Sequence, residues 1–130
     1  MKEFAAMEWQ RALRAVASAK MLADTDADSS ASRAYYASFH AITALFALRG
    51  QNFSKHSAIR AAVHRELIQT GEWPVELGKA YDFLIDMRET GDYGGVAKVS
   101  RQDAQMCIEK AAAIIRQIKN TCCFDLNISL

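Results

Sequence analysis

The sequence has few residues that interrupt helices, since its 130 residues include only one proline and six glycines. Proline and glycine are the strongest helix breakers, so their scarcity favours long helices, and we expect almost no β-strand. The sequence also has only three cysteines. Cys107, Cys122 and Cys123 have the spacing of neither a zinc site nor a disulfide framework. We therefore expect a reducing, cytoplasmic setting and neither a bound metal nor another cofactor.

Long apolar runs and an excess of charge are also absent. No stretch approaches the roughly 20 apolar residues that cross a bilayer, and residues 1–20 alternate charged with apolar side chains instead of forming a signal peptide. We expect a soluble protein that does not bind membranes. The formal net charge of +1 provides no general attraction to nucleic acid, so any contact with RNA requires a local cluster of basic residues.

What the sequence does contain is helical periodicity. Hydrophobic residues make up 51% of the chain and recur at helical spacing in five segments. A chain of this length forms one domain. We therefore expect one all-α domain over residues 1–120, folded as an antiparallel up-and-down bundle of about five helices. Residues 121–130 lack periodicity and are expected to form a loosely ordered tail.

Polar residues indicate where the helices begin and end. Asp28 or Ser29 is expected to cap the helix that contains residues 32–50, and Ser54 is expected to cap the next helix. The stretch 90–99 contains three glycines and is expected to be a flexible connection between the last two helices.

The first helix is expected over residues 2–23. Its spacing predicts a buried stripe that includes Trp9, Leu13 and Val16, while Glu8 falls outside this stripe.

The helix over residues 32–50 differs from an ordinary surface helix because two of its faces are occupied. At about 100° per residue, one face is aromatic and apolar and the other combines small residues with two basic ones. The first face contains Tyr35, Phe39, Ile42 and Phe46, and the second contains Arg33, Ala37, His40 and Ala44. We expect this helix to lie at the centre of the bundle, with its alanine face close to a neighbouring helix.

Arg88 stands where a helix starting near Pro74 would be expected to place an apolar residue, in line with Leu77 and Leu84. Such an arginine must extend to solvent, pair with a carboxylate such as Asp92, or receive an anionic ligand, because an unpaired buried charge costs several kcal/mol. Pairing with Asp92 and an anion site remain open alternatives. The histidines lack the spacing of metal ligands.

Three segments of the sequence resemble the HEPN family of domains. They are residues 32–41 (SRAYYASFHA), residues 55–57 (KHS) and residues 88–93 (RETGDY), and the resemblance extends over roughly residues 4 to 120. The last segment resembles the Arg-x3-Asp-Tyr signature of small prokaryotic members of this family.

This resemblance implies an antiparallel helical bundle that forms a homodimer and is encoded beside a nucleotidyltransferase-fold partner, as a toxin and antitoxin pair. Many HEPN domains are metal-independent ribonucleases with an Arg-x4-6-His motif. In that motif the arginine stabilises charge on the scissile phosphate, and the histidine transfers a proton. Here Arg88 matches the arginine, but Tyr93 stands where a histidine could be, and no histidine follows it.

The leading interpretation is a HEPN-type module that binds a nucleotide or an RNA phosphate in one polar cleft. The residues expected to line this cleft are Arg33, Tyr36, His40, His56, Arg88, Asp92 and Tyr93. The alternative is a ribonuclease in which Arg88 acts with a relocated histidine, either His40 or His56. A third interpretation is a purely structural polar network at a dimer contact.

Overall fold

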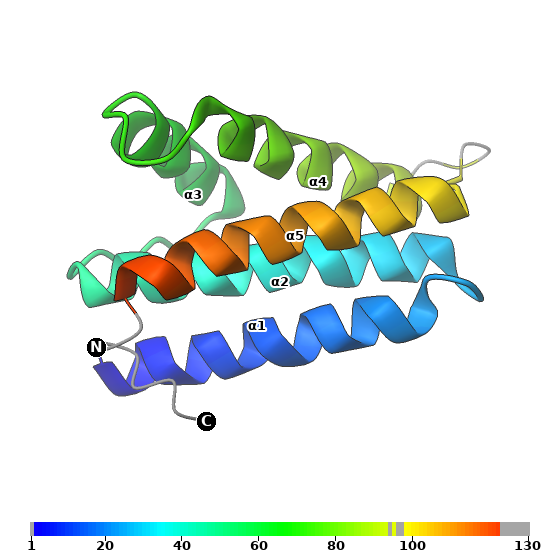
Figure 1. The fold of residues 1–130 in the computed structure, drawn as a ribbon, viewed down its shortest axis with the longest axis horizontal. Coiled ribbons are helices and arrows are strands. Elements are labelled where there is room, and N and C mark those ends of the chain that lie inside the picture. Colours follow the sequence, from blue (N-terminus) through cyan, green and yellow to red (C-terminus); the bar gives the residue numbers. More distant parts are fainter. Residues whose placement is uncertain (1, 94, 96–97, 123–130) are drawn as a thin grey trace.

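The structure is a computed structural model that describes residues 2–93, 95 and 98–122. Its elements within these ranges are all helical, as the sequence predicts (Figure 1). They are α1 (Lys2–Leu22), α2 (Ala27–Leu48), α3 (His56–Ala62), the π-helix η1 (Val63–Ile68), α4 (Val75–Tyr93) and α5 (Arg101–Cys122). The tail was expected over residues 121–130; residues 121 and 122 belong to α5, and residues 123–130 lie outside the described residues.

The four long helices form an antiparallel bundle with α2 at its centre. Helix α2 packs against α1, α4 and α5. Figure 1 shows that α1, α2, α4 and α5 alternate in direction along the long axis, while α3 is short and lies at one end beside the start of α4. The prediction of an up-and-down bundle with a central second helix is therefore confirmed.

Helix α2 begins earlier than predicted, because its cap is Asp26 rather than Asp28 or Ser29. The Asp26 carboxylate accepts a hydrogen bond from the backbone N–H of Ser29 at 3.1 Å, as a side-chain cap does. Asp28 instead accepts a hydrogen bond from the backbone N–H of Val99 at 2.8 Å. Its carboxylate thus ties the start of α2 to the segment before α5.

The predicted N-terminal cap of the third helix is also wrong. Lys55, not Ser54, occupies the cap position, and it makes no side-chain capping hydrogen bond. After two turns the α-helix changes into the π-helix η1, whose wider turns appear in proteins mostly as short segments.

Helix α4 extends further than predicted, through residues 90–93 to Tyr93. Asp92 therefore follows Arg88 by one helical turn instead of lying in a loop. This difference matters for the site, because the helix fixes the direction of both side chains.

The contact between α1 and α2 is made by small residues. The buried face of α1 consists mainly of Ala5, Ala12, Ala15 and Ala19, together with Trp9 and Glu8. The hydroxyl of Ser30 in α2 donates to the backbone oxygen of Ala19 at 2.7 Å, which requires a close approach of the two helices. The close approach on the alanine face of α2 is thus confirmed. Leu13 and Val16, predicted to be buried, are only half-buried.

The aromatic face of α2 faces the centre of the bundle, as predicted. Tyr35 and Phe46 are at most 2% exposed, and Ile42 is fully buried. No helix among the described residues is both long enough and apolar enough to span a bilayer.

Candidate functional site

Tyr36 connects two arginines that are far apart in the sequence. Its half-buried ring lies 5.1 Å from the Cζ atom of Arg33 and 5.3 Å from that of Arg88. These distances are within cation–π range. In addition, Nη2 of Arg88 donates a hydrogen bond to the Tyr36 hydroxyl at 3.1 Å. The phenol therefore positions cationic groups that come from α2 itself and from α4.

Arg88 is largely buried although its charge is only partly paired. Its side chain is 18% exposed, and its Nε lies 3.5 Å from Oδ2 of Asp92. At this distance the two groups form an ion pair, but the buried Nε has no hydrogen-bond partner among the described residues. Burial alone lowers the pKa of Arg88, yet the phenols of Tyr36 and Tyr35 outweigh it, and the pKa is raised. The guanidinium therefore stays charged.

Tyr93 also lies near Arg88, but at the surface. Its ring centroid is 5.9 Å from Cζ of Arg88, and the residue is 73% exposed. Of the predicted site residues at the end of α4, Asp92 thus pairs with Arg88 while Tyr93 borders it from the solvent side.

His56 opens α3 and reaches the same cluster. Its Nδ1 shares a hydrogen bond with the hydroxyl of Tyr35 at 3.0 Å, and its ring centroid is 4.2 Å from that of Phe39. Burial lowers the pKa of His56, and the positive charge of Arg88 and the His40 imidazole lower it further. The imidazole is therefore predominantly neutral at neutral pH, as a proton acceptor must be.

His40 is held by a residue that the sequence analysis missed. Its Nδ1 donates to Oε1 of Glu8 at 2.9 Å, and Arg11 donates to the other carboxylate oxygen at 2.8 Å. Glu8, which was expected to lie outside the buried stripe of α1, is only 3% exposed. Its spacing from Ala5 and Ala12 places it on the alanine face of α1, and this spacing was the available signal.

Four of the predicted side chains line two hollows rather than one cleft, with Arg33 and His40 in one and His56 and Arg88 in the other, whereas Tyr36, Asp92 and Tyr93 are in the lining of neither. The first, of about 340 Å3, is lined by Arg11, Arg14, Ala15, Ser18, Arg33 and His40. The second, of about 150 Å3, is lined by Tyr35, His56, Ser57, Arg60, Ile85, Arg88 and Glu89. Tyr36 contacts an arginine of each hollow. The two hollows are thus neighbours. Three of their arginines were not among the predicted site residues, namely Arg11 and Arg14 of α1 and Arg60.

Chemically, the first hollow favours anions, and the second offers guanidinium donors that carboxylates partly neutralise. The first hollow presents three guanidinium groups, and no carboxylate is part of its lining. The second hollow presents Arg60 and Arg88 with one acidic residue, Glu89. Among residues 2–93, 95 and 98–122, no group of three or more His, Cys, Asp or Glu side chains is arranged to hold a metal ion.

The comparison with known protein families agrees with this architecture. Residues 6–121 match the sequence profile of the HEPN domain. The chain belongs to the HEPN family.

Proteins from three prokaryotes are similar in sequence to this chain. A Thermotoga maritima protein named "UPF0332 protein" is 36% identical over 113 residues, which cover 85% of this chain and 86% of that protein. A similarly named protein from Gloeobacter violaceus is 32% identical over 108 residues, or 82% and 86% of the two chains. A Methanocaldococcus jannaschii protein named "Putative toxin" is 28% identical over 92 residues, or 71% of this chain and 63% of that protein.

Within this HEPN domain, His56 is the histidine that lines the same hollow as Arg88. His40 lines the neighbouring hollow. The sequence left both histidines open as the relocated partner of Arg88, and the tertiary structure places them in different hollows.

Proposed function

We propose that this HEPN protein is a toxin-like module that binds a phosphate group of a nucleotide or RNA beside Arg88. The observation that carries this proposal is the state of the Arg88 side chain. It is 18% exposed, lines a hollow, and has a buried Nε without a hydrogen-bond partner among the described residues. A phosphate oxygen is a strong acceptor for such a donor, and an arginine can bind it through two N–H groups.

The other residues of the second hollow support the same ligand class. The Ser57 hydroxyl and the imidazole of His56 add polar groups that suit phosphate oxygens. Arg60 adds a further guanidinium, although its Nε also lies 3.1 Å from the Asp82 carboxylate. The hollow is small, so we expect it to take one phosphate group rather than a whole nucleotide.

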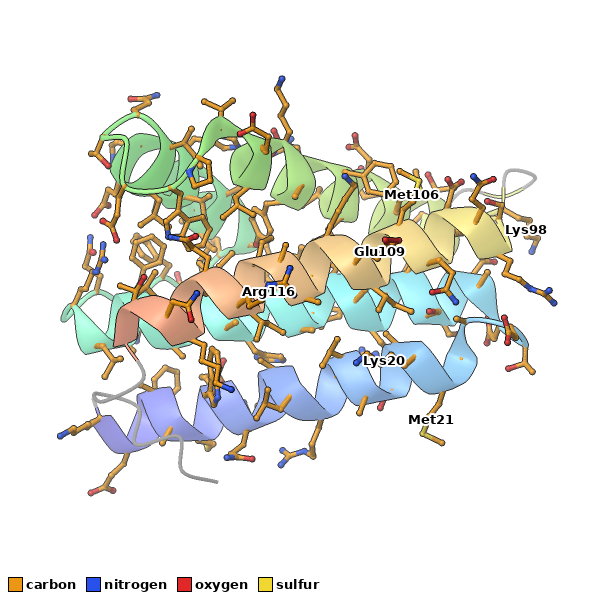
Figure 2. All side chains as sticks on the ribbon, in the orientation of Figure 1. Lys20, Met21, Lys98, Met106, Glu109 and Arg116 are labelled. Atoms are coloured by element: carbon orange, nitrogen blue, oxygen red, sulfur yellow. The ribbon has the colours of Figure 1, made fainter. Side chains whose placement is uncertain are left out.

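The binding experiment uses isothermal titration with a 5′-mononucleotide such as UMP, at low salt. We expect Arg88→Gln to weaken binding by about tenfold or more, because it removes a charged hydrogen-bond donor. Arg116→Gln is the matched control, since it removes one guanidinium from the exposed face of α5 (Figure 2). If both variants bind UMP as the unmodified protein does, or if none binds, the proposal is wrong. Circular dichroism establishes that each variant is folded.

The toxin-like part of the proposal rests on the family and on the name of the Methanocaldococcus jannaschii relative. This part of the proposal is that the protein forms a homodimer and that a nucleotidyltransferase-fold partner neutralises the toxin. We expect induced expression in a bacterial host to slow growth, and expression of Arg88→Gln at equal level to do so less. Light scattering of the purified protein should give twice the mass of 14.4 kDa. Growth unaffected at high expression would contradict the toxin-like role.

A second candidate function is metal-independent cleavage of RNA. It is favoured by the common hollow of Arg88 and His56, and by the lowered pKa of His56, which keeps the imidazole neutral. In this reaction the imidazole would accept the proton of a ribose 2′-hydroxyl, while Arg88 stabilises the charge on the phosphate.

The cleavage test incubates a labelled RNA with the protein in EDTA. The ribonuclease interpretation predicts cleavage that is lost in both Arg88→Ala and His56→Ala. The His40→Ala variant distinguishes the two histidines, since it should retain cleavage if His56 is the base. RNA that stays intact at high protein concentration would rule out the enzyme and leave the binding module.

A further inference from the structure

The first hollow is lined mainly by basic side chains. Three arginines, Arg11, Arg14 and Arg33, line it together with His40. At about 340 Å3 it is larger than the hollow beside Arg88. Its guanidinium groups come from two antiparallel helices, α1 and α2, so the cluster exists only because these helices pack together.

Glu8 gives this hollow a fixed framework. The carboxylate is 3% exposed and accepts hydrogen bonds from Arg11 at 2.8 Å and from His40 at 2.9 Å. A buried carboxylate with two such partners holds both side chains in defined positions. The histidine uses Nδ1 for this bond, which leaves Nε2 as its other polar atom.

The remaining charges in the first hollow are not neutralised in the same way. No carboxylate lies within ion-pair distance of Arg14 or Arg33 among the described residues. Arg33 instead lies over the ring of Tyr36. The Glu8 carboxylate therefore pairs with only one of the three guanidinium groups, and the hollow keeps an excess of positive charge that an anion would offset.

Aromatic rings connect this hollow with the hollow beside Arg88. Tyr36 contacts both Arg33 of the first hollow and Arg88 of the second. The ring of Phe39 likewise lies 5.5 Å from that of His40 and 4.2 Å from that of His56. Two hollows that both contain arginines thus flank a half-buried aromatic pair.

We propose that the first hollow is a second phosphate subsite, and that the ligand is a single-stranded nucleic acid with one phosphate in each hollow. The strand crosses α2 at Tyr36, where a base stacks on the phenol or on the guanidinium above it. This inference rests on the proposed function, because it takes the hollow beside Arg88 as the other subsite.

The arrangement favours a nucleic acid strand over an acidic peptide. Arginines that alternate with aromatic rings match the alternation of phosphates and bases along a strand, and stacking is a general feature of single-strand binding. Guanidinium groups also suit the several oxygens of a phosphate. The net charge of +1 means that such binding depends on this cluster rather than on the whole surface.

The test measures the affinity for a fluorescent oligouridylate of about eight nucleotides by anisotropy, over a range of salt concentrations. The variant is Arg14→Gln, which removes a guanidinium that makes no ion pair among the described residues. The control is Arg116→Gln on α5. We expect Arg14→Gln to weaken oligonucleotide binding by about tenfold and to lower the slope of log K against log salt by about 0.7. UMP binding in the hollow beside Arg88 should not change, because Arg14 does not line that hollow.

Each other outcome has a defined meaning. If Arg14→Gln binds the oligonucleotide like the control, the second subsite is wrong, while UMP binding that depends on Arg88 leaves the proposed function intact. If Arg14→Gln weakens UMP and the oligonucleotide equally, one common site replaces the two. If Arg88→Gln changes the affinity for neither UMP nor the oligonucleotide, the proposed function is wrong, and so is the proposal of a strand that bridges the two hollows. Displacement of the oligonucleotide by an equally long polyglutamate at similar concentration overturns the choice of nucleic acid.

Discussion

Arg88 in α4 donates a hydrogen bond to the hydroxyl of Tyr36 in α2, across 52 positions of the sequence. The same phenol ring carries the guanidinium of Arg33. This contact fixes the direction of the Arg88 side chain while its Nε stays without a hydrogen-bond partner among the described residues. The consequence is a pre-oriented cation, which loses little rotamer entropy when an anion binds.

Tyr36→Phe should show how much the orientation of the Arg88 side chain contributes, because it leaves the charge of Arg88 in place. It removes the acceptor of the Arg88 hydrogen bond but keeps the ring, so we expect a loss of about 1 kcal/mol in the free energy of unfolding. The affinity for UMP should fall as well, because Arg88 is less well held. Urea denaturation and isothermal titration measure the two effects. Tyr93→Phe is the matched control, since Tyr93 is 73% exposed, and an equal effect of both changes would contradict the role given to Tyr36.

Glu8→Gln should destabilise the fold by about 1–3 kcal/mol. The buried carboxylate serves Arg11 and His40 together, and a neutral amide cannot accept both bonds with the same strength. The measurement is the midpoint of urea unfolding, compared with Glu3→Gln, which changes an exposed residue of the same helix. Equal midpoints would show that the network adds nothing to stability. Oligonucleotide binding should also weaken, since two side chains of the first hollow lose their anchor.

Gly91→Ala should be costly for a steric reason. A Cβ atom at this position would lie 2.9 Å from the backbone oxygen of Asp28, and backbone cannot move aside as a side chain can. We expect a loss of about 1–3 kcal/mol, despite the higher helix propensity of alanine. Gly78→Ala is the matched comparison, because the added Cβ would meet only the side chains of Ile68 and His64. A smaller loss for Gly78→Ala is expected in thermal unfolding, and the opposite order would contradict this view of the α2–α4 contact.

The pKa of His56 should be lower than the usual 6.5 in the folded protein. Burial is the main cause, and Arg88 and His40 add to it. The unfolded chain then takes up the proton first, so this residue costs stability as the pH falls through 6.5, and the cost is absent above that pH. An NMR titration of the imidazole resonances, assigned with His56→Gln, measures the midpoint. We expect the midpoint to rise when UMP is bound, and a free-state midpoint at or above 6.5 would contradict the assignment.

Hydrophobic periodicity predicted much of the fold because it acts over a few residues. The helical segments, the central position of α2 and its two occupied faces follow from spacing alone. The inward position of Arg88 follows from the same rule. Helix ends were predicted less well: Asp26 competes with two neighbouring residues that are equally good caps, and the glycines near the end of α4 do not prevent the helix from continuing to Tyr93.

The sequence by itself thus determined an all-helical bundle and the residue types of its polar cluster. Only the tertiary structure decided that Glu8 meets His40, 32 positions away, and that His56 rather than His40 shares a hollow with Arg88. The physical reason is that periodicity places a side chain on a face of its own helix. Packing between residues far apart in the sequence decides which helix faces meet and in which register along the helix axes.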